Sequence, residues 1–119
     1  MTRTTIDYGI DLGTTNSSIA LAVGIGTEVI KNNLDSELTP SAVYIHTNDT
    51  LWVGQNARAK ITDQRATDAV ALEFKRRMGT GFEYKLRGGR KMSPDELSAE
   101  VLKSLRGDVV RRKGEDPAA

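Results

Sequence analysis

Cysteine is absent from the 119-residue sequence, and aromatic residues make up only 5% of it. Without cysteine the chain can form no disulfide, thiolate metal site or thiol nucleophile, which fits a reducing compartment. The single histidine, His46, has no other ligand types at a suitable spacing, so we assign it no metal. Basic and acidic residues nearly cancel, 17 against 16, and therefore indicate no nucleic-acid partner.

Long hydrophobic runs are also missing. The segment 1–5 lacks the apolar core of a signal peptide, and no stretch approaches the length that spans a bilayer. We therefore expect a soluble, cytoplasmic protein with no membrane partner. Hydrophobic residues account for 38% of the chain, which is enough for one domain with an adequate but modest core.

The stretch 6–23 is predicted to form two strands joined by a glycine turn. Apolar residues alternate with polar or small ones on both sides of the turn, as in strands: Ile6, Tyr8, Ile10 and Leu12, then Ile19, Leu21 and Val23. Gly13 lets the backbone turn where a side chain would clash. The next four residues then offer successive backbone N–H groups, and three of them also offer hydroxyls: Thr14, Thr15, Asn16 and Ser17. Such N–H groups form a concave anion site that suits a polyphosphate.

Asp11 stands at the mouth of this turn. A carboxylate cannot usefully contact a phosphate directly, because both groups are negative. It fits there with a hydrated Mg²⁺ between them, since Mg²⁺ favours one or two carboxylates together with phosphate oxygens and water. An ordinary hairpin explains the same pattern, so the residues alone leave both interpretations open.

Further elements follow downstream. A turn at 24–27 and a third strand at 28–31 would complete an antiparallel three-stranded meander, and a hairpin is predicted from strands 42–45 and 51–53. A short helix pattern lies within 55–62, and a second, basic hairpin within 83–92. These elements together predict an α/β fold with extra hairpins.

A long C-terminal helix is predicted from its start signal. Ser93 is placed as the N-cap, Pro94 at the first helical position and Glu96 to complete a capping box. An apolar stripe then repeats every four residues through about residue 113: Leu97, Val101, Leu105 and Val109.

The segment 69–79 turns abruptly from apolar to basic and contains Lys75. One interpretation is a short amphipathic segment that ends in solvated positive charge, as at a helix C-terminus. The other is a lysine that places positive charge near the terminal phosphate of a nucleotide. The pattern alone does not decide between them.

The string Gly-Ile-Asp-Leu-Gly-Thr-Thr-Asn-Ser at 9–17 resembles the first phosphate loop of the DnaK, or seventy-kilodalton heat-shock, chaperones of the actin-like ATPase superfamily. Leu-Glu-Phe-Lys-Arg at 72–76, followed by Gly79, is similar to the family segment that carries its catalytic lysine. Lys75 falls on that position, whereas Arg77 and Met78 depart from the usual aliphatic pair. The stretch 92–102 also resembles the family.

The resemblance implies a partial actin-like (ribonuclease H-like) lobe over residues 1–119, with the long helix packed over the meander. It implies ATP and Mg²⁺ as cofactors, with Asp11 as the metal residue acting through water, Lys75 as the catalytic residue, and a phosphate-binding set of Gly13, Thr14, Thr15 and Asn16. It further implies a parent that hydrolyses ATP to ADP to drive protein folding. Its partners would be unfolded polypeptide clients, a J-domain co-chaperone and a nucleotide exchange factor.

The family's ATPase domain is much longer, and its second phosphate loop and adenosine pocket have no counterpart here. We therefore expect this fragment to bind Mg-ATP weakly and to be inactive alone. The first strand, at about 4–11, would lack a neighbour, and the helix face around 97–105 would be partly bare, so we expect self-association. Two alternatives are a sugar or small-acid kinase of the same superfamily and a non-catalytic docking module.

Overall fold

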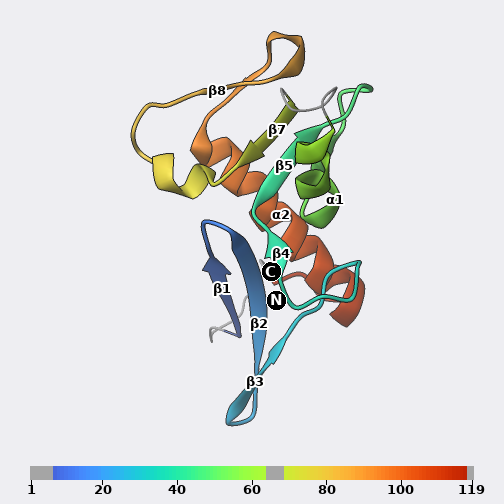
Figure 1. Cartoon of the computed structure of the whole chain (residues 1–119). Helices are drawn as coiled ribbons and strands as arrows, with labels where there is room; N and C mark the ends of the chain where they lie inside the picture. Colours follow the sequence, from blue (N-terminus) through green and yellow to red (C-terminus); the bar gives the residue numbers. More distant parts are fainter. Residues whose placement is uncertain (1–6, 64–68, 118–119) are drawn as a thin grey trace.

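The computed structural model describes residues 7–63 and 69–117 of a mixed α/β unit, in which two antiparallel sheets pack on one C-terminal helix and a short hairpin projects near the beginning of that helix (Figure 1). Ile6 and the rest of the predicted first strand before Asp7 lie outside the described residues. No helix in the described part of the chain is long and apolar enough to cross a membrane.

The first sheet is the predicted meander with one addition. Strands β1 (Tyr8–Leu12), β2 (Asn16–Val23) and β3 (Gly26–Val29) pair antiparallel in that order. The third strand begins two residues earlier than expected, because Gly26 pairs with Val23 and leaves a tight turn between them. The short strand β4 (Thr39–Pro40), which the sequence did not predict, pairs with the beginning of β2.

The second sheet contains the predicted hairpin of β5 (Ala42–Ile45) and β6 (Leu51–Val53), with β7 (Val70–Leu72) on the other side of β5. The segment 69–79 is not one continuous element. The chain instead forms strand β7 and then a separate 3-10 turn, η3 (Phe74–Arg77). Glu73 adopts a left-handed conformation between them, at φ 54°.

Two short pieces complete the described part of the fold. The predicted helix at 55–62 is α1 (Gln55–Arg58) continued by the 3-10 turn η1 (Ala59–Thr62). The predicted basic hairpin consists of β8 (Tyr84–Lys85), the 3-10 turn η4 (Arg87–Gly89) and β9 (Lys91–Met92).

Helix α2 (Pro94–Lys113) begins and ends as its sequence predicts. The Ser93 hydroxyl accepts a hydrogen bond from the Glu96 N–H at 3.0 Å, and the Glu96 carboxylate accepts one from the Ser93 N–H at 3.0 Å. Gly114 then ends the helix in a left-handed conformation. The expectation of a partly bare helix face is wrong, because the stripe is fully buried: Leu97, Val101, Leu105 and Val109.

The buried stripe of α2 explains where the core lies. The helix contacts β2 of the first sheet, β5 and β6 of the second, and η3, so it covers more than the meander. All four residues of β5 are buried, whereas β1 and β3 have no fully buried residue. The core is therefore centred between the second sheet and α2, and the first sheet reaches it mainly through Ile19 of β2 and Ile30.

Candidate functional site

The closed end of the β1–β2 hairpin carries the predicted anion-binding residues. Gly13, Thr14 and Thr15 form the turn, and Asn16 is already the first residue of β2, where it pairs with Pro40. The expectation that Ser17 offers its hydroxyl alongside these residues is wrong. Ser17 pairs with Leu12 and Thr39 in the sheet, and its side chain is buried.

Gly13 is required by the tightness of this turn. A Cβ atom built on Gly13 would lie 2.2 Å from the carbonyl oxygen of Asn16, which is closer than real Cβ contacts allow. Any side chain there would force the turn open. The glycine thus fixes how closely the two ends of the turn approach each other.

Ser41, which follows β4, binds the turn from the protein interior. Its N–H donates to the Thr15 carbonyl oxygen at 2.9 Å, and its hydroxyl donates to the Gly13 carbonyl oxygen at 2.8 Å. The Ser17 and Ser41 hydroxyl oxygens lie 2.9 Å apart in a buried hydrogen bond. Two carbonyl groups of the turn therefore face inward, and this removes negative partial charge from its outer face.

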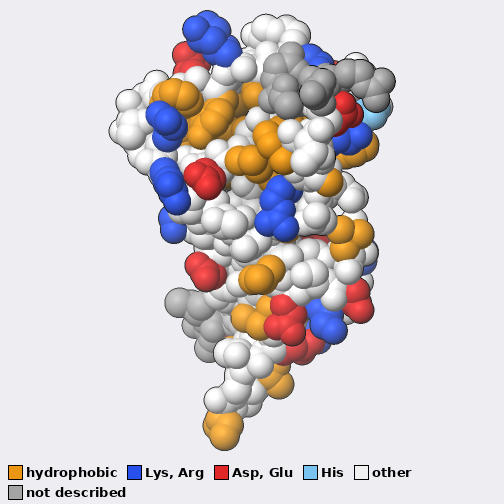
Figure 2. Space-filling model, in the orientation of Figure 1, with side chains coloured by type: hydrophobic (Ala, Val, Ile, Leu, Met, Phe, Trp, Pro, Cys, Tyr) orange, Lys and Arg blue, Asp and Glu red, His pale blue; other side chains and the backbone are white. Residues whose placement is uncertain are grey.

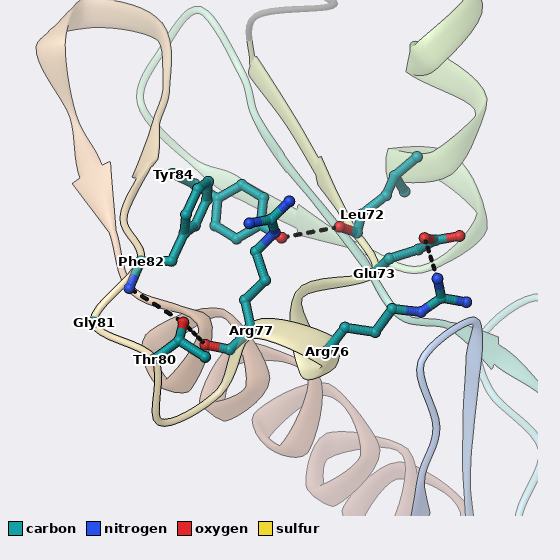
Figure 3. A pocket seen from close by; sticks show the side chains of 8 residues that line it. All are labelled: Leu72, Glu73, Arg76, Arg77, Thr80, Gly81, Phe82 and Tyr84. Carbon is teal, nitrogen blue, oxygen red and sulfur yellow. Dashed lines mark hydrogen bonds and ion pairs between the residues drawn. The ribbon is translucent and has the colours of Figure 1, made fainter.

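Asp11 and Lys75 are both exposed residues close to this end of the molecule. Asp11 lies in β1 opposite Ser18, one residue before the end of the strand. Lys75 lies in η3, which Figures 1 and 3 both draw beside the closed end of the β1–β2 hairpin. Within the described residues, neither side chain forms a hydrogen bond or ion pair. Both charges are thus available to a ligand.

The position of Lys75 follows from its neighbours. Phe74 is 1% exposed and anchors η3 in the core, where η3 packs against α2. The left-handed Glu73 turns the chain out of β7 just before this anchor. Because adjacent residues of the 3-10 turn point in different directions, burial of Phe74 leaves Lys75 at the surface.

The metal-binding groups near the turn fit a hydrated magnesium ion better than a metal that is coordinated by protein side chains alone. Among the described residues, no group of three histidine, aspartate or glutamate side chains could hold a metal. Asp11 is a single exposed carboxylate beside the turn. Mg²⁺ commonly takes one or two carboxylates and completes its coordination with phosphate oxygens and water.

A cavity of about 780 Å³ lies on another side of η3 (Figure 3). The sequence did not predict this cavity, although four of its lining residues belong to the lysine-bearing segment. The lining residues are Leu72, Glu73, Arg76, Arg77, Thr80, Gly81, Phe82 and Tyr84. The Arg77 guanidinium lies 4.2 Å from the centre of the Phe82 ring, and Arg76 pairs with Glu73 at 3.6 Å. Burial raises the pKa of Tyr84, which the Arg77 charge opposes. Arg77, which stands where the family usually has an aliphatic residue, therefore packs its guanidinium on the Phe82 ring.

The structure is a mixed α/β unit with antiparallel sheets, a C-terminal helix and a tight glycine turn near two exposed charged residues, Asp11 and Lys75. This arrangement is consistent with part of a chaperone ATPase domain. Residues 7–87, more than half of the chain, match the family model described as Hsp70 protein, and the chain therefore belongs to the Hsp70 family. The matched residues include the turn and Lys75, whereas α2 lies beyond them. Hsp70 proteins generally bind ATP with Mg²⁺ and interact with client polypeptides.

Proposed function

We propose that this chain is the N-terminal part of the nucleotide-binding domain of a DnaK-like chaperone, with an actin-like fold. The observation that carries the proposal is the juxtaposition at one end of the first sheet. A turn too tight for any residue but glycine lies beside an exposed carboxylate that has no partner among the described residues, and both fall within the family match. This arrangement suits the phosphates of Mg-ATP.

The residues would divide the work as follows. Gly13, Thr14, Thr15 and Asn16 would bind phosphate oxygens, mainly through backbone N–H groups. Asp11 would orient a water ligand of the metal. When bound, Mg²⁺ supplies positive charge that neutralises the phosphates.

Lys75 would act later in the reaction. Its ammonium group, which has no partner among the described residues, would stabilise charge on the terminal phosphate and position the attacking water. In the parent protein, hydrolysis would drive a conformational change that acts on unfolded polypeptides. A J-domain co-chaperone and a nucleotide exchange factor would be the partners, in the cytoplasm.

The segment Thr39-Pro40-Ser41 favours this function over the sugar or small-acid kinase. Kinases of the superfamily are expected to lack this segment. Here it forms β4 beside the first residues of β2 and supplies both hydrogen bonds from Ser41 to the turn. The segment that distinguishes the chaperone interpretation is thus built into the candidate phosphate site itself.

The replacement Lys75→Ala tests the proposed role in a full-length protein that contains this chain. We expect kcat for ATP hydrolysis to fall about 100-fold or more, as when one transition-state donor is removed, while the dissociation constant of ATP changes much less. Single-turnover hydrolysis and calorimetric titration measure the two quantities separately.

Arg76→Ala is the matched control, because Arg76 is an exposed cation in the same turn that is already paired with Glu73. It should leave both constants near their original values. Equal losses of binding and rate in Lys75→Ala would make Lys75 a simple phosphate anchor. Unchanged kinetics would show that it is only a solvated charge.

A further inference from the structure

Ser41 is distant in sequence from the turn but makes several hydrogen bonds at it. Its backbone and its side chain bind two different residues of the turn, Thr15 and Gly13. The side-chain contacts span 24 and 28 residues of the chain, to Ser17 and Gly13 respectively. Ser41 is 3% exposed, so water does not compete for these bonds.

The direction of the hydrogen bonds follows from proton counting. A serine hydroxyl has one proton to donate and two lone pairs to accept. The Ser41 hydroxyl donates to the Gly13 carbonyl oxygen, so the proton between the two hydroxyls must come from Ser17. The resulting relay runs from Ser17 through Ser41 to Gly13. Such buried chains polarise each bond and hold a defined geometry.

The backbone on both sides of Ser41 is held in the sheets. Ser41 lies between β4, which pairs with β2, and β5, which is buried throughout. Asn32 stabilises β4 and the residue before it. Its side-chain amide nitrogen donates to the Thr39 hydroxyl and to the Leu38 carbonyl oxygen, each at 3.0 Å. The turn is therefore fastened to the core through one serine.

We propose that Ser41 is a positioning residue that holds the turn 13–16 in its phosphate-binding conformation. The inference rests on the proposed nucleotide site and adds to it. Ser41 itself is buried beneath the turn and would contact no phosphate. It acts by keeping the Gly13 and Thr15 carbonyls inward, so that an anion meets N–H groups on the outer face.

The first experiment needs no nucleotide. Heteronuclear ¹H–¹⁵N NOE values of the Thr14, Thr15 and Asn16 amides are compared in the unmodified chain, Ser41→Ala, Ser17→Ala and Ser98→Ala. Ser98 is the matched control, a buried serine whose hydroxyl contacts the Met78 sulfur at 3.5 Å. We expect the values to fall strongly in Ser41→Ala, less in Ser17→Ala, and not in Ser98→Ala.

Two results would overturn the proposal. One is a turn in Ser41→Ala as rigid as in the unmodified chain. The other is an equal loss of rigidity in the β5–β6 hairpin, which would show general destabilisation. If Ser41→Ala does not fold, hydrogen exchange in the unmodified chain decides. The Ser41 amide should then exchange as slowly as the Gly54 amide, which donates to Ala42 at 3.0 Å, and free exchange would refute the proposal.

A second experiment uses the full-length protein. Ser41→Ala should weaken Mg-ATP binding about tenfold, a loss typical of a disturbed binding geometry, whereas Ser98→Ala should not. An unmodified protein that binds no Mg-ATP would refute the proposed function but leave the NOE result valid. Normal Mg-ATP affinity in Ser41→Ala would instead refute the positioning role.

Discussion

The two sheets of this molecule are stabilised in different ways. All of β5 in the second sheet is buried, and that sheet contacts both α1 and α2. In the first sheet, β1 and β3 are largely exposed, and Ile10 retains half of its accessible surface. Figure 2 shows a hydrophobic side chain at the projecting tip of the β2–β3 hairpin, where Ile25 is fully exposed. The candidate site thus lies on the sheet with less apolar burial.

Directional polar contacts replace much of that burial in the first sheet. The Asn32 side chain makes all four of its possible hydrogen bonds, to groups between Leu34 and Thr39. Arg112 donates to the Asn32 carbonyl oxygen at 2.7 Å, and Lys113 pairs with Glu28 at 2.8 Å. The second sheet thus supplies most of the apolar stability, whereas the first supplies a surface whose shape is set by polar contacts.

The largest effect should come from the core beneath the second sheet. Phe74→Ala removes a 1% exposed ring that anchors η3 against α2, and should lower the free energy of unfolding by about 3–5 kcal/mol. Phe82→Ala, which removes a partly exposed ring in the same region, should cost about 1 kcal/mol or less. Urea denaturation measures both. Similar losses would show that η3 is not anchored by the core.

The next effect concerns the turn of the first sheet. Gly13→Ala should cost about 1–3 kcal/mol, because the new methyl group clashes with the Asn16 carbonyl oxygen. Gly9→Ala is the control within the same hairpin, since a Cβ there meets no atom within 4 Å. Chemical denaturation of the two variants should separate them clearly. A harmless Gly13→Ala would mean that the turn opens readily, against the shape described above.

A smaller change is expected in association. Within the described residues, β1 pairs only with β2, so its other edge can pair with a second chain. We expect concentration-dependent self-association, which Ile10→Lys should reduce by placing a charge on this strand. Ile61→Lys, at a similarly exposed position in η1, should not. Light scattering over a concentration series tests this, and a strictly monomeric unmodified chain would contradict it.

The smallest effect should be a pH dependence near the end of α2. Burial raises the pKa of Asp108, against the opposing effects of Arg111 and Arg112. The folded state then binds a proton more tightly than the unfolded chain, so stability falls as pH rises from the ordinary aspartate pKa through the raised one. Asp108→Asn should remove this fall. The variant should therefore be more stable than the unmodified chain at pH 7, but not at pH 3.

Thermal unfolding at the two pH values measures this difference. Asp95→Asn is the control, because Asp95 is an exposed carboxylate in the first turn of the same helix. It should show no gain at pH 7. A loss of stability in Asp108→Asn that is larger at pH 7 than at pH 3 would show that its ion pair with Arg111 outweighs the cost of burial.

The elements with strong local signals were predicted well. The capping box at Ser93 and the four-residue apolar stripe defined α2, and alternation defined the meander and the β5–β6 hairpin. Lys75 and Asp11 were predicted to be functional residues, and their roles stay predictions. The structure adds that both side chains are exposed and without partners among the described residues.

The remaining features depend on contacts between distant residues. The strand β4 is only two residues long and exists because β2 offers it hydrogen bonds. The role of Ser17 was mistaken because its partner, Ser41, lies 24 residues away. In the segment 69–79, a strand and a 3-10 turn replace one amphipathic segment because β5 pairs with β7 and Glu73 turns the chain. Local patterns carry no signal for such pairings.

The late position of α2 in the chain has a consequence for synthesis. Its buried stripe, from Leu97 to Val109, closes the core over strands made much earlier, including β2 and β5. A ribosome therefore synthesises the strands of both sheets before the helix that covers them. The early hairpins can form locally, but their apolar faces stay uncovered until then, a state in which nascent chains aggregate. Slowed translation between β6 and α2 should lengthen that exposure and lower the soluble yield.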